Sequence, residues 1–332
     1  MTTDLATRMM AAEAGALRAA ADILARGGLV AFPTETVYGL GANALDASAV
    51  EKIYVAKNRP YASPLIVHVS DEWMARSVTA EWPELAHRLA AQFWPGPLTM
   101  VIRKAAAIPD IVTAGLESVG VRVPSHPVSL DLIRRSGVPI AAPSANRFGE
   151  ISPTRAEHVR AGLGERVAIV LDGGPSQVGI ESTVVSLSRN PPAVLRPGMI
   201  STEDLEAASG VRWDREMNLP RVVEQEPHES PGLNLRHYAP RTPFYVLEGG
   251  ATEPAGRGRV LQMPDCVEQY AGRLYDELHR ADAEAWDWIA VPDPPELPQW
   301  EGIRDRLRRA STPTGFAKTV SGSARKPRGD LS

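Results

Sequence analysis

The chain has 332 residues, of which 43% are hydrophobic and 23% charged, and its formal net charge is −4. These values are typical of a globular protein of two domains, and they do not favour a chain-wide basic surface for nucleic acid. The single cysteine, Cys266, excludes an intrachain disulfide and a cysteine zinc cluster. Because no apolar run approaches the ~20 residues of a membrane span and no secretory signal is evident, we expect a cytoplasmic protein outside the membrane.

A short buried strand over residues 29–32 is predicted to follow an alanine-rich helix over residues 12–26. Pro33 should end the strand, because proline cannot donate a hydrogen bond to a sheet. The residues that follow are mostly polar or glycine, and they include Thr34, Glu35, Thr36, Tyr38, Gly39 and Gly41. We interpret the two glycines as points where the backbone turns sharply or approaches a ligand. Strand exits of this kind often form sites in α/β proteins, although a plain polar loop, with Glu35 as a surface or capping carboxylate, fits equally well.

Two cations lie where the next predicted helix ends. Lys57 falls on the apolar face of that helix, so its ammonium either reaches water or points over a cleft. Pro60 favours an extended conformation at Arg59. The strand that follows, over residues 65–69, carries His68. A lone histidine is more often structural than catalytic, but the two cations nearby make this one a candidate for the site.

A second strand exit repeats the arrangement at Thr34. The strand over residues 138–142 ends at a proline, and Ser144 and Asn146 follow it. In one parallel or mixed sheet the two exits would face the same crevice. Arg122 points away from the valines of another predicted strand, so it is either solvated or lines a site.

The remaining elements alternate between helix and strand, which indicates an α/β fold. In the first domain, residues 12–210, helices are expected over 81–93, 127–136, 155–161 and 202–208, and strands over 98–103, 119–124, 167–171, 184–187 and 194–196. A proline-rich linker over residues 211–241 should lead to a small α/β domain, residues 242–310, with strands at 244–247, 260–263 and 289–291 and helices at 267–280 and 303–310. We expect residues 311–332 to be disordered.

Familiar catalytic motifs are missing from the sequence. There is no Walker-type phosphate loop, no dinucleotide-binding glycine fingerprint, no His-Glu-x-x-His metal helix and no nucleophile elbow. Cations and hydroxyl or amide side chains instead gather at strand exits: Lys57, Arg59, Arg122, Arg196, Thr34, Thr36, Ser144, Asn146, Ser152 and Ser182. Guanidinium groups bind phosphates and carboxylates through two hydrogen bonds. The set predicts an anionic ligand such as a nucleotide, with catalysis by positioning and charge stabilisation and a metal ion on the phosphates.

Ten short motifs resemble those of the Sua5/YrdC/YciO family in its two-domain Sua5 form. They occur in the family's order within residues 15–240: Pro33 to Leu40, Lys57 to Pro60, Pro64 to His68, Trp94 to Leu98, Val121 to Pro124, Ala142 to Asn146, Ser152 to Thr154, Glu181 to Val184, Leu195 to Gly198 and His237 to Pro240. Each motif alone is weak, and the ten in register carry the resemblance. The region after residue 240 is similar more faintly.

The resemblance implies a fold and a reaction. The fold is a twisted mixed sheet with helices around a concave cavity, plus a small Rossmann-like domain. The reaction, that of a nucleotidyltransferase, converts L-threonine, bicarbonate and ATP into L-threonylcarbamoyladenylate, pyrophosphate and water, with Mg²⁺ on the ATP. The product would pass to the tRNA threonylcarbamoyltransferase machinery, which modifies adenosine 37 in tRNAs that read codons beginning with A. The linker would close over the cavity and exclude water, and direct tRNA contact stays open.

The resemblance also implies roles for residues. L-Threonine binding would fall to Thr36, His68, Arg122, Ala142 and Ser182. ATP binding would fall to Arg59, Ser63, Ser118, Ser144, Asn146, Ser152, Arg196 and Tyr238. The candidate catalytic residues are Lys57, Arg59 and His68, and no residue is expected to bind a metal ion. The amine of threonine must be neutral to react, and the ordinary pKa of histidine makes His68 a candidate base. Ser63 stands where the family often has Lys or Asn.

Two other classes of protein contain a related domain. An RNA-binding module without synthase activity would use the same cavity, but the net charge argues mildly against it and the intact cation and hydroxyl motifs favour chemistry. The hydrogenase-maturation carbamoyltransferase needs zinc-finger cysteines, which this chain lacks.

Overall fold

The computed structural model describes residues 8–215, 228–232, 237–247 and 253–312. Much of the predicted linker and nearly all of the predicted disordered tail lie outside these ranges. The domain limits given above therefore stay predictions. Within the described ranges, no helix is long and apolar enough to cross a membrane.

The larger unit is built on a mixed sheet of eleven strands. Along the sheet their order is β1-β8-β2-β3-β7-β4-β6-β5-β9-β10-β11. Their bounds are β1 (Arg8–Ala11), β2 (Val30–Phe32), β3 (Gly39–Asn43), β4 (Ile66–His68), β5 (Leu98–Arg103), β6 (Ser118–Arg122), β7 (Ile140–Ala141), β8 (Ile169–Asp172), β9 (Thr183–Ser186), β10 (Ala193–Arg196) and β11 (Asp214–Arg215). Parallel pairs such as β4 with β6 adjoin antiparallel pairs such as β2 with β3, which confirms the predicted mixed sheet.

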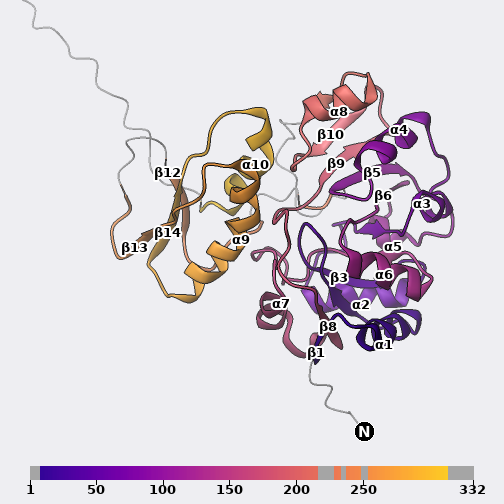
Figure 1. Cartoon of the computed structure of the whole chain (residues 1–332), viewed down its shortest axis with the longest axis horizontal. Helices are drawn as coiled ribbons and strands as arrows, with labels where there is room; N and C mark the ends of the chain where they lie inside the picture. Colours follow the sequence, from indigo (N-terminus) through magenta and orange to yellow (C-terminus); the bar gives the residue numbers. More distant parts are fainter. Residues whose placement is uncertain (1–7, 216–227, 233–236, 248–252, 313–332) are drawn as a thin grey trace, which may run out of the picture.

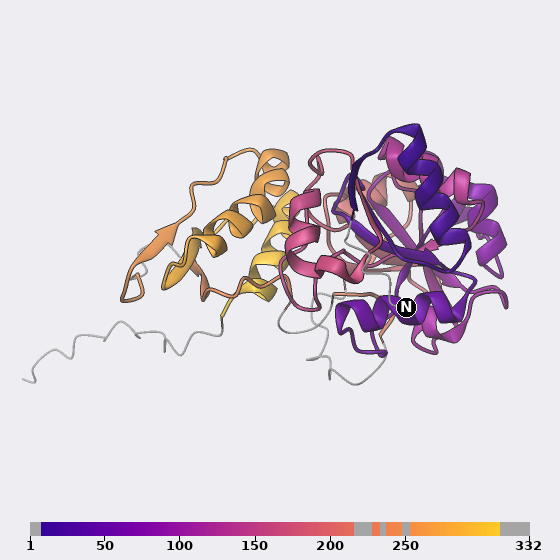
Figure 2. The ribbon, with the colours of Figure 1, turned by 90° about the horizontal axis from the view of Figure 1, so that it is seen from below.

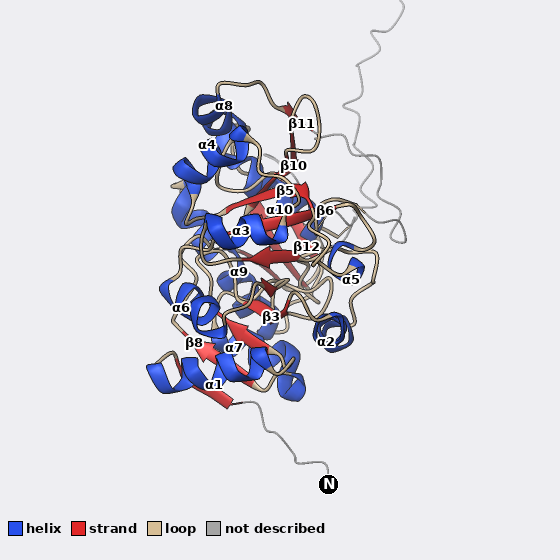
Figure 3. Ribbon diagram, turned by 90° about the vertical axis from the view of Figure 1, so that its right-hand side faces the viewer, coloured by secondary structure: helices blue, strands red, loops and turns tan. Residues whose placement is uncertain are grey.

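Helices cover both faces of this sheet (Figure 3). They are α1 (Ala14–Ala25), α2 (Ala47–Lys57), α3 (Glu72–Val78), α4 (Glu84–Phe93), α5 (Asp110–Thr113), α6 (Pro127–Ser136), α7 (Ala156–Leu163) and α8 (Thr202–Ser209). Successive side chains of a strand point to opposite faces. Val30 and Phe32 accordingly pack in the core beneath α1 and α6, whereas Ala31 packs in the core beneath α2, α5 and α7.

Of the two roles predicted for Gly39 and Gly41, a sharp turn or a close approach to a ligand, the sharp turn is not observed. Gly39 and Gly41 lie in β3, which returns antiparallel beside β2. The reason is packing: a Cβ atom on Gly41 would lie 2.7 Å from both the Phe32 ring and the Ile140 side chain. Glycine is therefore required by the core at this position.

The smaller unit has three parallel strands in the order β12-β14-β13 and two helices. Its elements are β12 (Phe244–Leu247), β13 (Gly258–Val260), α9 (Val267–Ala283), β14 (Trp288–Pro292) and α10 (Glu301–Ala310). Strand β13 begins two residues before its predicted start. In both ribbon views α9 and α10 lie between these strands and the larger unit (Figures 1 and 2).

The two units share one hydrophobic core. Ile151 and Ile180 of the larger unit pack with Leu274 and Ile303 of the smaller one. The contact is close at Gly302, where a Cβ atom would lie 2.5 Å from the carbonyl oxygen of Gly198. A side chain at residue 302 would push α10 away from the larger unit.

Candidate functional site

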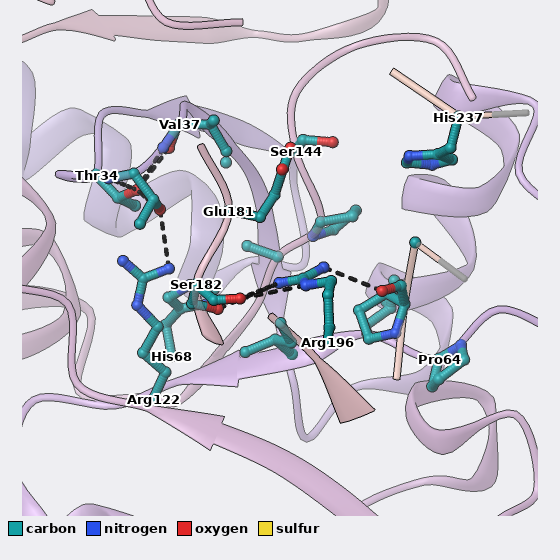
Figure 4. Close-up of a pocket in the computed structure, with 18 of the residues that line it drawn as sticks. Thr34, Val37, Pro64, His68, Arg122, Ser144, Glu181, Ser182, Arg196 and His237 are labelled. Carbon is teal, nitrogen blue, oxygen red and sulfur yellow. Dashed lines mark hydrogen bonds between the residues drawn. The ribbon is translucent and has the colours of Figure 1, made fainter. Parts of the chain in front are cut away.

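A pocket of about 560 Å³ opens where several strands of the large sheet end (Figure 4). Nine predicted site residues line it: Thr36, Arg59, His68, Arg122, Ala142, Ser144, Ser182, Arg196 and Tyr238. The two predicted strand exits do face one crevice, because Gly39 forms a bridge with Ser144 and both residues line the pocket. Figure 4 shows Ser182 between Arg122 and Arg196.

The first strand exit folds into a hydroxyl-stabilised turn. The Thr34 hydroxyl donates to the carbonyl oxygen of Val37 at 2.6 Å and accepts the backbone N–H groups of Thr36 and Val37, each at 3.2 Å. Such local bonds are the reason that threonine suits turns. They fix the Thr36 hydroxyl 2.8 Å from the Thr34 hydroxyl.

Arg122 is the buried cation beside this turn. Its Nη1 donates to the Thr36 hydroxyl at 2.9 Å and its Nε to the carbonyl oxygen of Gly96 at 3.2 Å. Its Nη2 lies 2.6 Å from Oε1 of Glu35, in an ion pair whose two side chains are 4% and 6% exposed. The suggestion that Glu35 is a surface carboxylate is therefore wrong. A buried partner holds the Arg122 guanidinium in one orientation.

His68 lies beside Arg122, since the two residues are register partners of β4 and β6. Burial, with a further contribution from Arg122, lowers the pKa of His68 to about 3. The imidazole is therefore neutral near pH 7 and too weak a base for the role that we predicted from the ordinary pKa of histidine. Its Nδ1 is buried without a protein hydrogen-bond partner, so it is available to a ligand.

Lys57 does not line the pocket, in contrast to its predicted catalytic role. Its ammonium is buried and donates to the carbonyl oxygens of Ser144, at 2.6 Å, and Asn146. Burial lowers the pKa of Lys57 well below its ordinary value. The residue holds the second strand exit in place, and it lies outside the pocket lining.

Two further guanidinium groups reach the pocket from the other side. Arg59 donates through Nη2 to the carbonyl oxygen of Pro64 at 2.9 Å, and its burial lowers its pKa to about 10. Arg196 donates through Nη2 to the carbonyl oxygen and hydroxyl of Ser182, at 3.0 and 3.2 Å. Its Nη1 donates to the carbonyl oxygen of Pro231 at 3.0 Å, so Arg196 ties β10 to the described part of the linker.

Glu181, His237 and Tyr238 complete this side. Glu181 is buried, accepts the Ser152 hydroxyl at 2.5 Å, and has its pKa lowered mainly by Arg306 and Arg196, against the effect of burial. The Tyr238 hydroxyl is buried without a protein partner. We gave Glu181 and His237 no role from the sequence, although both lie in motifs that carried the resemblance.

Five predicted site residues lie outside the pocket lining: Lys57, Ser63, Ser118, Asn146 and Ser152. The carbonyl oxygen of Ser63 accepts Nε of Arg59 at 3.2 Å, and the Asn146 amide donates to the carbonyl oxygens of Arg147 and Glu150. Ser118 lines a smaller neighbouring cavity, which shares Pro64 with the main pocket. These residues support or adjoin the pocket, and direct contact with a ligand stays a prediction for each.

The pocket is suited to an anionic ligand. Three guanidinium groups reach it. Arg122 pairs with the buried carboxylate of Glu35, and the charge of Arg196 helps to lower the pKa of the buried Glu181 carboxyl. The described residues contain no group of three His, Cys, Asp or Glu side chains that could hold a metal ion.

Known protein families match this chain over most of its length. The profile of the Sua5, YciO and YrdC family, described as "Telomere recombination", matches residues 22–198, and that described as "Threonylcarbamoyl-AMP synthase, C-terminal domain" matches residues 200–312. The threonylcarbamoyl-AMP synthase of Bacillus subtilis strain 168 is 41% identical over 321 residues, which cover 88% of this chain and 92% of the relative. That of Pyrococcus abyssi is 38% identical over 323 residues, covering 89% and 94%.

The fold is also that of a solved relative. The crystal structure of P. abyssi Sua5 complexed with L-threonine matches with a TM-score of 0.83 at 36% identity, over 92% of this chain and 97% of that one. This match confirms the predicted combination of a large twisted sheet with a small Rossmann-like domain. The chain belongs to the Sua5/YrdC/YciO family.

Proposed function

We propose that the chain is an L-threonylcarbamoyladenylate synthase, which converts L-threonine, bicarbonate and ATP into L-threonylcarbamoyladenylate, pyrophosphate and water. The observation that carries the proposal is the pocket itself. It combines a wall of Thr36, His68 and Arg122 with a second wall of Arg59 and Arg196. Full-length relatives named as this synthase support the same conclusion.

Threonine would bind at the wall formed by β4, β6 and the first strand exit. Its carboxylate would face Arg122, the cation that the sheet holds most firmly. The unpartnered Nδ1 of His68 and the Thr36 hydroxyl would take the hydroxyl and amino groups. Because neutral His68 is a weak base, we propose that the positive surroundings disfavour the ammonium form of threonine and release its proton.

ATP would bind with its phosphates near Arg59 and Arg196, and Ser144 and Tyr238 would complete the contacts. A cavity next to Pro64 and Ser118 would extend the site for the nucleoside. The threonine nitrogen would form its bond to the carbon of bicarbonate with loss of water, and a carbamate oxygen would then displace pyrophosphate from the α-phosphorus. The guanidinium groups would stabilise charge on the phosphates during that displacement.

The chemistry of the product sets its next step. We propose that the adenylate serves the threonylcarbamoyl modification of adenosine 37 in tRNAs that read codons beginning with A. A mixed anhydride of this kind hydrolyses in water, so it would pass promptly to the tRNA threonylcarbamoyltransferase machinery in the cytoplasm. The alternative of an RNA-binding module without synthase activity is not favoured by the relatives.

A product assay tests the proposal. Purified protein is mixed with L-threonine, bicarbonate, Mg²⁺ and ATP, and pyrophosphate and the threonylcarbamoyl adduct are followed together. Both should appear only with threonine, Arg59→Ala should abolish both, and Arg103→Ala, an exposed residue of β5, should leave both unchanged. ATP cleavage without the adduct would exclude threonine as the substrate. No turnover combined with tight RNA binding would favour the binding module.

A further inference from the structure

We propose that Arg306 in α10 is a positioning residue of the synthase site and acts through Glu181 and Tyr238. The smaller domain would then be a structural part of the ATP wall, although it supplies no described side chain to the pocket lining. This inference rests on the proposed synthase function. It assigns a role to a buried cation that the mechanism above does not use.

The Arg306 side chain is fully buried, and every hydrogen bond and ion pair described for its guanidinium joins it to the larger unit or to its neighbour Asp305. Its Nε lies 2.7 Å from Oε2 of Glu181, and its Nη2 donates to the carbonyl oxygen of Glu181 at 3.2 Å. Its Nη1 donates to the carbonyl oxygen of Pro197 at 2.9 Å and contacts Asp305 at 2.7 Å. One side chain thus holds two separate segments of the larger unit.

In each of the two segments, the residue that Arg306 contacts is directly adjacent in the sequence to a residue that lines the pocket. Glu181 precedes Ser182, and Pro197 follows Arg196. Arg196 and Ser182 bond to each other on the pocket side, as described above, while Arg306 joins their neighbours from behind. A shift of Arg306 would therefore change the distance between the Arg196 guanidinium and the space for the phosphates.

Tyr238 receives a similar support from the smaller domain. The Arg306 guanidinium carbon lies 5.3 Å from the centroid of the Tyr238 ring, and the Tyr275 ring stacks on it at 5.9 Å. Tyr238 has φ of 62°, in the left-handed region that is rare for a residue other than glycine. Such a conformation persists only where the surroundings impose it. The hydroxyl, which has no protein hydrogen-bond partner, packs against Gly232, where a Cβ atom would lie 2.2 Å from it.

Cohesion between the domains does not require this ion network. A buried ion pair is weak evidence for stability, because apolar residues of the same volume often serve as well or better. The apolar contacts at Ile180, Leu274 and Ile303 already join the two domains. The charged contacts instead concentrate where Glu181 borders the pocket, and Tyr275 adds a hydrogen bond to the same carboxylate at 3.0 Å.

The test compares nucleotide and threonine binding in two gentle variants of the full chain. Arg306→Lys keeps the charge but loses the forked contacts, and Tyr275→Phe removes one hydroxyl. We expect the KM for ATP to rise about 10- to 100-fold in Arg306→Lys and about 3- to 10-fold in Tyr275→Phe, the usual range for hydrogen bonds to charged groups. Calorimetry with an ATP analogue that carries a methylene between the α- and β-phosphates should show the same loss. The Kd for L-threonine should change less than that for the nucleotide. Of the residues predicted to bind threonine, only Ser182 adjoins the segments that Arg306 holds, and none of the described contacts of Arg122 involves the smaller domain.

Arg304→Lys is the matched control. This arginine lies on the same helix and pairs with Asp293 and Glu296 on the outer side, so the variant should match the wild type. Unchanged nucleotide binding in both test variants would overturn the inference. Equal losses of threonine binding and nucleotide binding that accompany a fall in Tm would also overturn it. If the wild type itself makes no adduct, the proposed function fails. If the wild type is active and both test variants bind nucleotide as it does, only the role of Arg306 is contradicted.

Discussion

The two walls of the pocket are built in different ways. The wall with Thr36, His68 and Arg122 consists of neighbouring strands and one turn, and its bonds join residues of a single sheet. The wall with Arg196 and Tyr238 combines the end of β10 with the described part of the linker and the support of the smaller domain. The first wall is therefore set when the sheet forms, whereas the second requires that two domains dock correctly.

Each wall is supported by a buried arginine–glutamate pair. As with the walls, one pair lies within a single unit and the other joins the two units. Arg122 and Glu35 belong to one unit and lie beside the proposed threonine position. Arg306 and Glu181 lie in different units and border the proposed ATP position. The difference suggests that amino-acid binding should survive changes that disturb domain docking, and that nucleotide binding should not.

The largest effect is expected for Arg122→Lys, which changes the rigid wall. A lysine cannot reproduce the three contacts of the guanidinium with Thr36, Glu35 and Gly96. We expect kcat/KM for threonine to fall about 10²- to 10³-fold, as when a buried charged contact is removed. Threonine-dependent pyrophosphate release measures this loss. The Kd for the ATP analogue should stay within about threefold, and an equal loss for both ligands would remove the distinction between the walls.

A smaller effect, confined to the other ligand, is expected for Arg196→Lys. The variant keeps a cation but loses the fork that joins Ser182 to Pro231, so the linker is no longer tied to β10. We expect the KM for ATP to rise about 10- to 50-fold, with threonine binding nearly unchanged. Steady-state kinetics with each substrate varied in turn checks this. A rise in the KM for threonine of the same size would contradict the proposed division of the site.

The sequence predicted individual elements better than the contacts between them. Local periodicity was sufficient for α6 and β5, whose observed bounds equal the predicted ones. The similar sequences of the strand exits at Thr34 and Ser144 also correctly predicted that these two distant segments face one crevice. Chain order alone could not show that Gly41 is required by the ring of Phe32, since that contact depends on how the strands pair.

Burial sets what individual site residues can do, and residue type alone does not show it. The resemblance made Lys57 and His68 catalytic candidates; in the structure the buried lysine bonds to carbonyl oxygens, and burial lowers the pKa of the histidine. The support of Glu181 by Arg306 joins residues 125 positions apart. No local pattern indicates such a pair, because it arises only when the two units dock.

A moderate effect is expected when acid disturbs the docked interface. His158 of α7 stacks on His279 of α9 at 3.8 Å, and burial lowers the pKa of each to about 4. At a pH below about 6.5, the ordinary pKa of histidine, these two imidazoles become protonated in the unfolded chain but stay neutral in the native chain. Stability should therefore fall as the pH drops from about 6.5 towards 4, by up to about 1.4 kcal/mol per pH unit for His279.

The variant His279→Gln tests this dependence. The glutamine amide can still donate to the carbonyl oxygen of Ser152, which His279 contacts at 3.1 Å, but it does not titrate in this range. We expect the Tm of the variant to decline less than that of the wild type between pH 6.5 and 4.5. Scanning calorimetry measures it, with His87→Gln on the surface as the control. Parallel declines in both proteins would show that the stacked pair does not titrate on unfolding.

The smallest effect is expected for Ser63→Ala, at a residue predicted to bind ATP. Ser63 is buried outside the pocket lining, and the contacts described for it use its backbone carbonyl oxygen, which accepts Tyr54 at 3.0 Å and Arg59 at 3.2 Å. Alanine keeps that carbonyl, so Arg59 should stay in place and the KM for ATP should change less than about threefold, which is below 1 kcal/mol. A tenfold rise would mean that the hydroxyl itself reaches the nucleotide, and the ATP wall would then extend past Arg59 into the loop before β4.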